Sequence, residues 1–462
     1  MMKTTRTNIL SIALMQLTFL FSGCAVVKTP YSRSDYYNKT ITALNEIKPS
    51  VKTLTDTLQA GFSRLSIVPG IDEIRGSKKK KKGIPIAGYG QLKTKYASGI
   101  HDTVFVRAIA LKIDSVTRII VSAEMLIMPP NIIDSVLTRL AGLGLKREQL
   151  FFSSTHAHSS IGGWGYGVMA RLMAGKRNLS IEDFLVKRIS QAALDARADL
   201  RPASIGSGFF DAPQYTVNRL THNPEHNNIS FDYVLIEQLH ARKAVLGTYS
   251  AHATTLPSDN TLISGDYPGY WSRKIENSGF GEAMFCAGSM GGQSPAGKGK
   301  AFESSAFIGE SLADSVLAGI SRIRTSPVIS ASSISLETAL PEYHFRLSPK
   351  RNFTTGFSKW LMPAPENVYL QALRLNNLIW FFTPGDFSGE SSNLLRRLMK
   401  GDGYRSVVSG YNGSYVGYII PGKYFYLDHY EPRMMGWFGP TMGDYIFELM
   451  DEMGKSLISG GQ

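Results

Sequence analysis

Residues 151–164 read FFSSTHAHSSIGGW, and this segment indicates both the fold and a site. Its apolar beginning is typical of a buried strand, and its glycine-rich end is typical of a turn. Alternate side chains of a strand point the same way, so we expect His156 and His158 on one side of the chain. Two imidazoles there can hold a metal ion, or one metal ion and a proton-transfer group. With nine histidines in 462 residues, the alternative is a chance pair that is hydrogen-bonded at a strand end.

Strand and helix patterns alternate outward from this segment and indicate one α/β domain. Strands are predicted at 103–113, 118–127, 150–153, 234–238, 245–250, 283–287, 328–336, 368–373, 378–383 and 406–409. Helices are predicted at 132–142, 181–197, 303–321, 389–399 and 442–457. The segments 234–238 and 245–250 are expected to pair as an antiparallel hairpin.

The N-terminus is typical of a targeting segment, and we expect residues 1–24 to be a lipoprotein signal peptide. Lys3 and Arg6 precede the apolar stretch 9–21, which is short for a membrane span. The next residues, FSGC at 21–24, resemble a bacterial lipobox with Cys24 as the acylated residue. This predicts a lipid-anchored protein of the bacterial cell envelope, whose membrane contact is made through Cys24. An ordinary secretory signal is the alternative, and the single remaining cysteine, Cys286, excludes an intramolecular disulfide.

Residues 25–82 are expected to lie outside the catalytic domain, which is placed at 83–462. After a short linker, apolar residues recur at spacings of three and four from Tyr37 to Leu58, which predicts a helix that Pro49 kinks. A lysine run at 78–82 follows. It is interpreted as a solvated loop, with contact to anionic lipid headgroups as the alternative.

The charge balance allows nucleic acid or an anionic surface as a partner, because the formal net charge is +13. Five of these charges lie in the run 78–82, and the sequence carries no nucleic-acid-binding motif, so we expect no nucleic-acid partner. The loop 288–299 has five glycines but lacks the Gly-Lys-Ser/Thr signature of a P-loop, so we expect no nucleotide.

Further short motifs occur in order along the chain. They read GIPIAGYG (83–90), GIH (99–101), VNR (217–219), NP (223–224), AHAT (251–254), SGD (264–266), PGDF (384–387), GYNGSYVGY (410–418), YE (430–431) and FGPT (438–441). Together with 151–164, this ordered set resembles the neutral/alkaline (non-lysosomal) ceramidase family over roughly residues 80–450. The resemblance implies two mixed β-sheets packed between helices in αββα layers. It also implies that the immunoglobulin-like C-terminal domain of the family's full-length members is absent.

The resemblance further implies a zinc site, in which three or four protein ligands leave one position open. The ligands that it implies are His156, His252, Asp386 and Tyr418. Taken alone, His252 would be read as a hydrogen-bonded core histidine and Tyr418 as a packing residue.

Asp386 departs from the family pattern, which has glutamate in Pro-Gly-Glu-Phe. Aspartate is one methylene shorter, so either the backbone comes closer or the carboxylate binds in a monodentate or water-mediated way. Glu390 is the alternative ligand. If the segment is helical, Asp386 and Glu390 share a face.

Four more residues have roles that the resemblance implies. His158 is expected to transfer a proton to the leaving amine or to hydrogen-bond the forming oxyanion, and Tyr430 to donate a second hydrogen bond to that oxyanion. Arg219 is expected to orient the substrate, and Ser294 to position the substrate or its loop, since no base is adjacent to it in sequence. A surface position for Arg219 and simple packing for Tyr430 are the alternatives.

The expected function is zinc-dependent hydrolysis of the amide bond of ceramide or a related N-acyl lipid, which releases a fatty acid and a lipid amine. The loops 162–174 and 347–365 are expected to set the preference for acyl chain and headgroup. Two alternatives remain: a zinc amidohydrolase acting on a non-sphingolipid amide, and a non-catalytic ligand-binding lipoprotein of the same fold.

Overall fold

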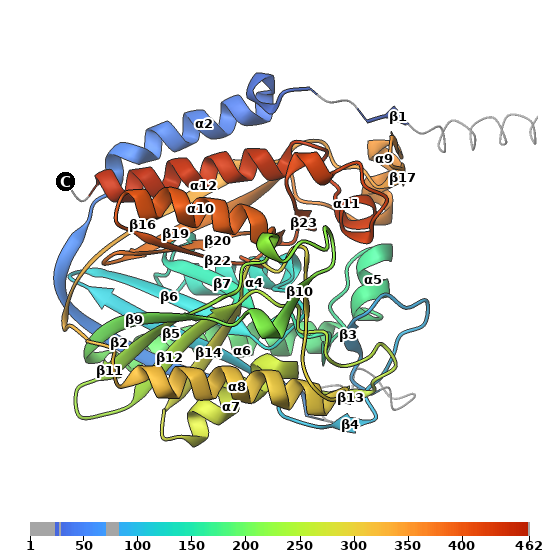
Figure 1. Ribbon diagram of the computed structural model, residues 1–462. Helices are drawn as coiled ribbons and strands as arrows, with labels where there is room; N and C mark the ends of the chain where they lie inside the picture. The colour runs from blue at the N-terminus through green and yellow to red at the C-terminus, as the bar shows by residue number, and fades with distance from the viewer. Residues whose placement is uncertain (1–23, 27–28, 71–82, 461–462) are drawn as a thin grey trace, which may run out of the picture.

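The computed structural model describes residues 24–26, 29–70 and 83–460, and its main feature is a sheet of twelve strands (Figure 1). Strand β2 (Leu54–Ser66) joins its two parts. The first residues of β2 pair with β16, and its later residues lie between β5 and β9. Side chains of β2 such as Leu58 and Phe62 are buried, which is why this strand can lie inside the molecule.

The first part of the sheet holds β5 (Phe105–Ile113), β6 (Val116–Ala123), β7 (Leu150–Ser154), β9 (Arg201–Asp211), β11 (Ser230–Gln238), β12 (Lys243–Tyr249) and β14 (Glu282–Ala287). This part curls and brings β6 next to β14, where the Ser122 hydroxyl donates a hydrogen bond to the Phe285 carbonyl at 2.6 Å. The second part holds β16 (Val328–Ala339), β19 (Asn367–Leu375), β20 (Leu378–Phe382) and β22 (Arg405–Ser409). A buried apolar cluster that includes Phe151 and Trp380 brings the two parts together.

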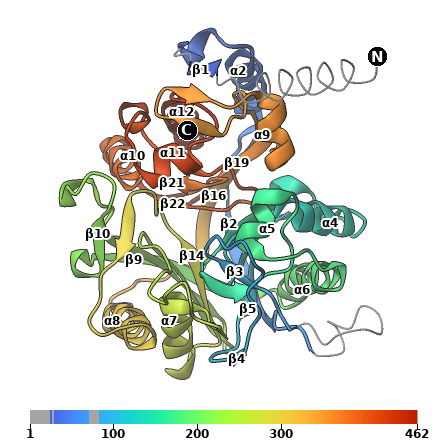
Figure 2. The ribbon, with the colours of Figure 1, turned by 90° about the vertical axis from the view of Figure 1, so that its right-hand side faces the viewer.

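Helices cover the outer faces in three groups (Figures 1 and 2). The first group is α4 (Pro130–Ala141) with α6 (Leu179–Ala198), and the second is α7 (Asp266–Asn277) with α8 (Phe302–Ile320). The third is α2 (Asp35–Ile47), α10 (Gly389–Gly401) and α12 (Met442–Ser459), which lie over the second part of the sheet. The expected α/β fold with mixed sheets between helices is confirmed, although β2 links the two expected sheets into one.

The helix predicted from Tyr37 to Leu58 is wrong beyond Ile47. Pro49 lies in a 3-10 turn at 48–50, and the chain then enters β2, in which Thr55 and Thr57 favour an extended backbone. The predicted domain start at residue 83 therefore leaves a central strand of the sheet outside the domain. The lysine run at 78–82 lies outside the described residues.

Among the elements that were not predicted, the two long ones, β9 and α7, were missed for local reasons. Strand β9 contains Pro202, Gly206 and Gly208, which weaken a strand pattern, and α7 contains Pro268 and Gly269 in its first turn. The predicted hairpin is confirmed, since β11 and β12 pair antiparallel.

Short pairs of strands hold the loops at one end of the sheet. They are β3 (Ile86–Gly88) with β8 (Ser159–Ile161), β4 (Gly99–Ile100) with β13 (Leu262–Ile263), β10 (Thr216–Asn218) with β15 (Gln293–Pro295), and β21 (Asp386–Phe387) with β23 (Tyr418–Ile419). The ends of β7, β14 and β22 meet there, because the Ser153 hydroxyl donates to the Gly410 carbonyl and the Gly410 amide donates to the Ala287 carbonyl. Functional side chains are expected at this end, which carries the loops that follow parallel strands.

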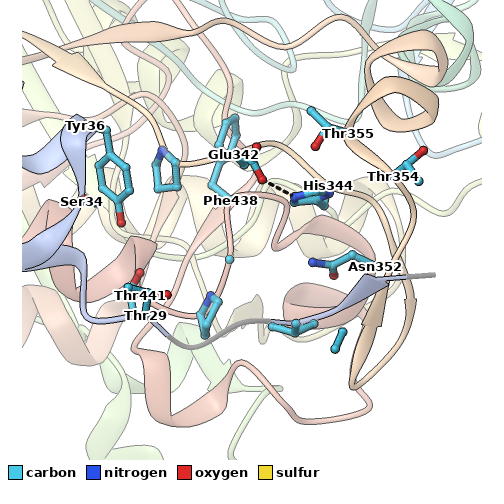
Figure 3. A pocket seen from close by; sticks show the side chains of 15 residues that line it. Thr29, Ser34, Tyr36, Glu342, His344, Asn352, Thr354, Thr355, Phe438 and Thr441 are labelled. Atoms are coloured by element: carbon cyan, nitrogen blue, oxygen red, sulfur yellow. Dashed lines mark hydrogen bonds and ion pairs between the residues drawn. The ribbon is translucent and has the colours of Figure 1, made fainter. Parts of the chain in front are cut away.

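The N-terminal segment packs beside the C-terminal part of the chain. Strands β1 (Cys24–Ala25), β18 (Arg351–Asn352) and β17 (Arg346–Ser348) form a small sheet, and α9 (Thr355–Leu361) follows. A cavity of about 470 Å³ lies between this sheet, the start of α2 and the turn 438–441, with Glu342 and His344 paired at 3.2 Å in its wall (Figure 3). Among the described residues, no helix has the length and apolar character of a membrane span.

Candidate metal centre

Two histidines follow strand ends and turn the same ring nitrogen toward one point. His156 comes two residues after β7 and has a positive φ of 59°, and its Nδ1–H donates to the Leu126 carbonyl at 2.7 Å. His252 comes three residues after β12, and its Nδ1–H donates to the Gln293 carbonyl at 2.7 Å. Each Nε2 is therefore left with a lone pair. A backbone carbonyl that fixes the tautomer of a histidine in this way is typical of metal ligands.

Asp386 supplies a carboxylate to the same point. Its Oδ1 lies 3.4 Å from the Nε2 of His252 and 3.9 Å from the Nε2 of His156. The Tyr411 hydroxyl donates to Oδ1 at 2.5 Å, and the Tyr415 hydroxyl donates to Oδ2 at 2.8 Å. The ligand atoms of the two histidines and Asp386 lie within 4.8 Å of one another, and all three residues are buried.

Tyr418 reaches the cluster through strand pairing. Asp386 of β21 lies opposite Tyr418 of β23 in a parallel pair, so both side chains enter the site together. The Tyr418 hydroxyl is 2.8 Å from the Nε2 of His252. The structure thus brings together all four residues that the family resemblance implied as ligands.

The backbone around Asp386 is closely packed. A Cβ atom on Gly385 would lie 2.3 Å from the Gly417 carbonyl oxygen, and one on Gly291 would lie 2.9 Å from the Asp386 carbonyl oxygen. Only glycine fits at such distances. Glu390 lies elsewhere, at the start of α10, where it accepts a hydrogen bond from Lys423 at 2.5 Å. Asp386 lies in β21, ahead of that helix, so the idea of a shared helical face is wrong.

The protonation states of these side chains suit the binding of a cation. Burial and the neighbouring Arg219 lower the pKa of His252 to about 4, so its imidazole is neutral near pH 7. Burial opposes the ionisation of Asp386, but His156, His252 and the Tyr411 hydroxyl outweigh it and lower its pKa to about 2. Two neutral imidazoles and one carboxylate are the ligand set that a divalent transition metal prefers. The residues present therefore fit a metal ion.

His158 lies beside the cluster as expected, but strand alternation is not the reason, because β7 ends at Ser154 and His156 has a positive φ of 59°. Its Nε2 is 3.1 Å from the Nε2 of His156, and its ring packs 4.9 Å from the ring of Tyr89. Burial and the neighbouring imidazoles lower the pKa of His158 well below its usual range. Its Nδ1 is buried and has no hydrogen-bond partner among the described residues. The lowered pKa keeps this imidazole neutral and makes it a weak base, so a proton that it takes up is readily passed on.

Arg219 connects the remaining residues of the site. One terminal nitrogen donates to the Tyr418 hydroxyl at 2.7 Å and lies 3.1 Å from the Nε2 of His252. Its Nε donates to Glu431 at 2.6 Å, and its other terminal nitrogen is 3.5 Å from the Ser294 hydroxyl. Ser294 thus faces an arginine, which suits a positioning role better than that of a nucleophile.

Tyr430 lies at the rim of the site. Its ring centroid is 6.3 Å from that of Tyr418, and about half of the side chain is exposed. Glu431, the next residue, is fully buried, and its second oxygen accepts a hydrogen bond from the Gly292 amide at 2.9 Å. Sequence reasoning gave no role to Glu431, Tyr411 or Tyr415. All three lie in motifs that it had singled out.

This chain is similar to a family of known proteins. The family model for the N-terminal region of neutral/alkaline non-lysosomal ceramidases matches residues 70–305. The chain belongs to this family. Neutral ceramidase of Mycobacterium tuberculosis is 26% identical over 235 residues, a match that covers 46% of this chain and 36% of the relative. The chain thus matches about a third of the length of this curated relative.

Solved structures of the family share the fold. The crystal structure of neutral ceramidase from Pseudomonas aeruginosa superposes with a TM-score of 0.74 at 17% identity, over 88% of this chain and 75% of that one. A ceramidase complexed with C2 gives a TM-score of 0.75 at 18% identity, over 88% and 76%. The family match contains His156, Arg219 and His252, whereas Asp386 and Tyr418 lie beyond residue 305 and meet them through the fold.

Proposed function

We propose that this protein hydrolyses the amide bond of ceramide or a related N-acyl lipid, with a zinc ion bound by His156, His252, Asp386 and Tyr418. The convergence of two tautomerically fixed imidazoles on one buried carboxylate is the observation that carries the proposal. Family membership points to the same chemistry. Zinc in such a site lowers the pKa of a coordinated water and polarises an amide carbonyl.

The side chains around the cluster transfer the proton and stabilise the carbonyl oxygen. His158 has one ring nitrogen without a hydrogen-bond partner among the described residues and lies beside His156, so it carries the proton from the attacking water to the leaving nitrogen. The amide C–N bond breaks as the new C–O bond forms, and the products are a carboxylate and an amine. Tyr430, whose ring centroid lies 6.3 Å from that of Tyr418, donates a hydrogen bond to the carbonyl oxygen as it gains charge.

Arg219 and Glu431 act by holding the others in place. Arg219 donates to the Tyr418 hydroxyl, and the buried carboxylate of Glu431 fixes the guanidinium from the opposite side. A preorganised set of donors of this kind costs little reorganisation during the reaction.

Metal content and activity test the proposal together. We expect about one zinc ion per chain, retained in Glu390→Gln and lost in both His156→Ala and Asp386→Asn. The zinc-loaded protein should release fatty acid from N-acylsphingosine. Hydrolysis only of amides that lack a sphingoid base would replace ceramide as the substrate. Zinc without any hydrolysis would favour a binding protein, and no zinc after reconstitution would refute the mechanism.

We also propose that Cys24 is acylated and anchors the protein in the bacterial cell envelope. The lipobox-like sequence at 21–24 supports this. Intact mass spectrometry of the protein from membranes should give a chain that begins at Cys24 and carries acyl groups, whereas Cys24→Ser should lose them. An unmodified cysteine in the membrane-derived protein would refute the anchor.

A further inference from the structure

We propose that an exposed apolar surface beside the site docks on an anionic lipid bilayer. This surface, here called the docking rim, is formed by Leu92, Tyr166, Val168 and Trp360. The inference rests on the proposed function, because a bilayer is where an N-acyl lipid is found.

The exposure of these side chains is unusual for their type. Leu92 is 94% exposed and Trp360 is 66% exposed, and with Tyr166 and Val168 they line one open groove of about 550 Å³. The groove lies between α5 (Val168–Ala174) and α9, the regions that sequence analysis linked to lipid preference. The other four of the chain's five tryptophans are buried. Apolar side chains gathered on a surface usually mark a contact with a partner or a membrane.

The docking rim is continuous with the wall of the site. Tyr89 packs against His158, and the chain reaches Leu92 three residues later. The Gln91 amide donates to the Leu172 carbonyl of α5 at 3.0 Å. From α5 the surface passes to α9, because Gly167 lies against the Pro363 ring. Figure 2 looks onto this end of the molecule, where α5 and α9 are neighbours.

Basic side chains accompany the apolar ones. Lys93 follows Leu92, Lys359 precedes Trp360, and Arg171 lines the groove itself; all three are exposed. Glu366 partly neutralises Lys359, at 3.5 Å. Cations beside exposed aromatic and aliphatic side chains suit a surface with anionic headgroups over acyl chains, and each lysine or arginine there contributes about 1 kcal/mol.

The start of the described chain lies at the same edge. Cys24 of β1 pairs with Asn352 of β18, and α9 begins three residues after Asn352. An acyl group on Cys24 and the docking rim would therefore engage one bilayer together. Stable attachment generally needs two such signals, because one acyl chain binds only weakly.

Tryptophan fluorescence of the full-length protein tests the docking rim, since Trp360 is the only exposed tryptophan. Vesicles of equal parts phosphatidylcholine and phosphatidylglycerol should shift its emission to shorter wavelength, and brominated acyl chains should quench it. Pure phosphatidylcholine vesicles should give a smaller effect. Leu92→Ser should weaken binding about tenfold. Leu239→Ser is the matched control, because this equally apolar, exposed leucine lies in the β11–β12 turn at the opposite end of the sheet.

Hydrolysis separates this inference from the proposed function. Leu92→Ser should cleave ceramide in vesicles about tenfold more slowly, and a soluble short-chain amide at the parent rate. A parent that cleaves neither substrate while Trp360 still enters the bilayer refutes the function and keeps the docking rim. The docking rim is refuted if vesicles neither shift nor quench the emission of Trp360. It is also refuted if the emission shifts without lipid and the shift grows with protein concentration. That second result would assign this surface to contact with a second copy of the chain.

Discussion

Tyr415→Phe should weaken metal binding without removing any metal ligand. The Tyr415 hydroxyl donates to Oδ2 of Asp386 at 2.8 Å, while Oδ1 faces His252 and His156. A hydrogen bond to a charged acceptor contributes about 1.5–3 kcal/mol to stability. Without it, the carboxylate can rotate away from the two imidazoles. Loss of such a supporting contact costs about 10- to 100-fold in metal affinity.

Tyr249→Phe is the matched control. Tyr249 is fully buried at the end of β12, and its hydroxyl donates to the Ala212 carbonyl at 2.5 Å and not to Asp386. Its loss should lower the free energy of unfolding by about 1–3 kcal/mol and leave the metal affinity unchanged.

Zinc titration in competition with a chelating dye, at fixed pH, measures the affinity of each variant. The reasoning fails if Tyr415→Phe binds zinc within about threefold of the parent, which is well below the range expected for a supporting contact. It also fails if Tyr249→Phe weakens zinc binding as much, because the effect would then reflect general loosening of the fold.

Three further changes test other parts of the structure. Glu431→Ala leaves the guanidinium of Arg219 without its buried partner and should lower the free energy of unfolding, measured by denaturant titration, by about 3–5 kcal/mol. Gly385→Ala places a methyl group 2.3 Å from the Gly417 carbonyl and should cost about 1–3 kcal/mol and reduce zinc content. Burial raises the pKa of Glu282 to about 7, so its contribution to stability is full below pH 4.5 and is lost as the pH rises to 7. The unfolding free energy of the parent should fall by about 3 kcal/mol over that range relative to Glu282→Gln, and parallel pH profiles would contradict this.

Local patterns were sufficient for most of the core and failed where a distant strand decides the structure. The strand predicted at 150–153 is β7, because the apolar run there is too short for a helix and a glycine-rich turn follows. In residues 54–66 the apolar spacing is compatible with a helix. Pairing with β5 and β9, which are distant in the sequence, makes this segment a strand instead. Periodicity within one segment carries no information about such partners.

The site shows the same division. Motifs placed His156, His252, Asp386 and Tyr418 in one set, although 262 positions separate the first from the last. Three features follow only from the folded chain. They are the register of β21 on β23, the ring nitrogen that each histidine turns toward the site, and the buried contact between Glu431 and Arg219. Polar residues that support ligands resemble ordinary core tyrosines and glutamates in sequence, and a sequence pattern cannot distinguish them.

The placement of Asp386 shows how backbone and side chain together position a ligand atom. Its short side chain brings Oδ1 to 3.4 Å from the Nε2 of His252, and glycines at 385 and 291 let the backbone approach where a Cβ would collide. Tyr411 and Tyr415 then occupy both carboxylate oxygens from the outer side. The close backbone packing and the two tyrosine hydroxyls therefore fix the Asp386 carboxylate between His156 and His252.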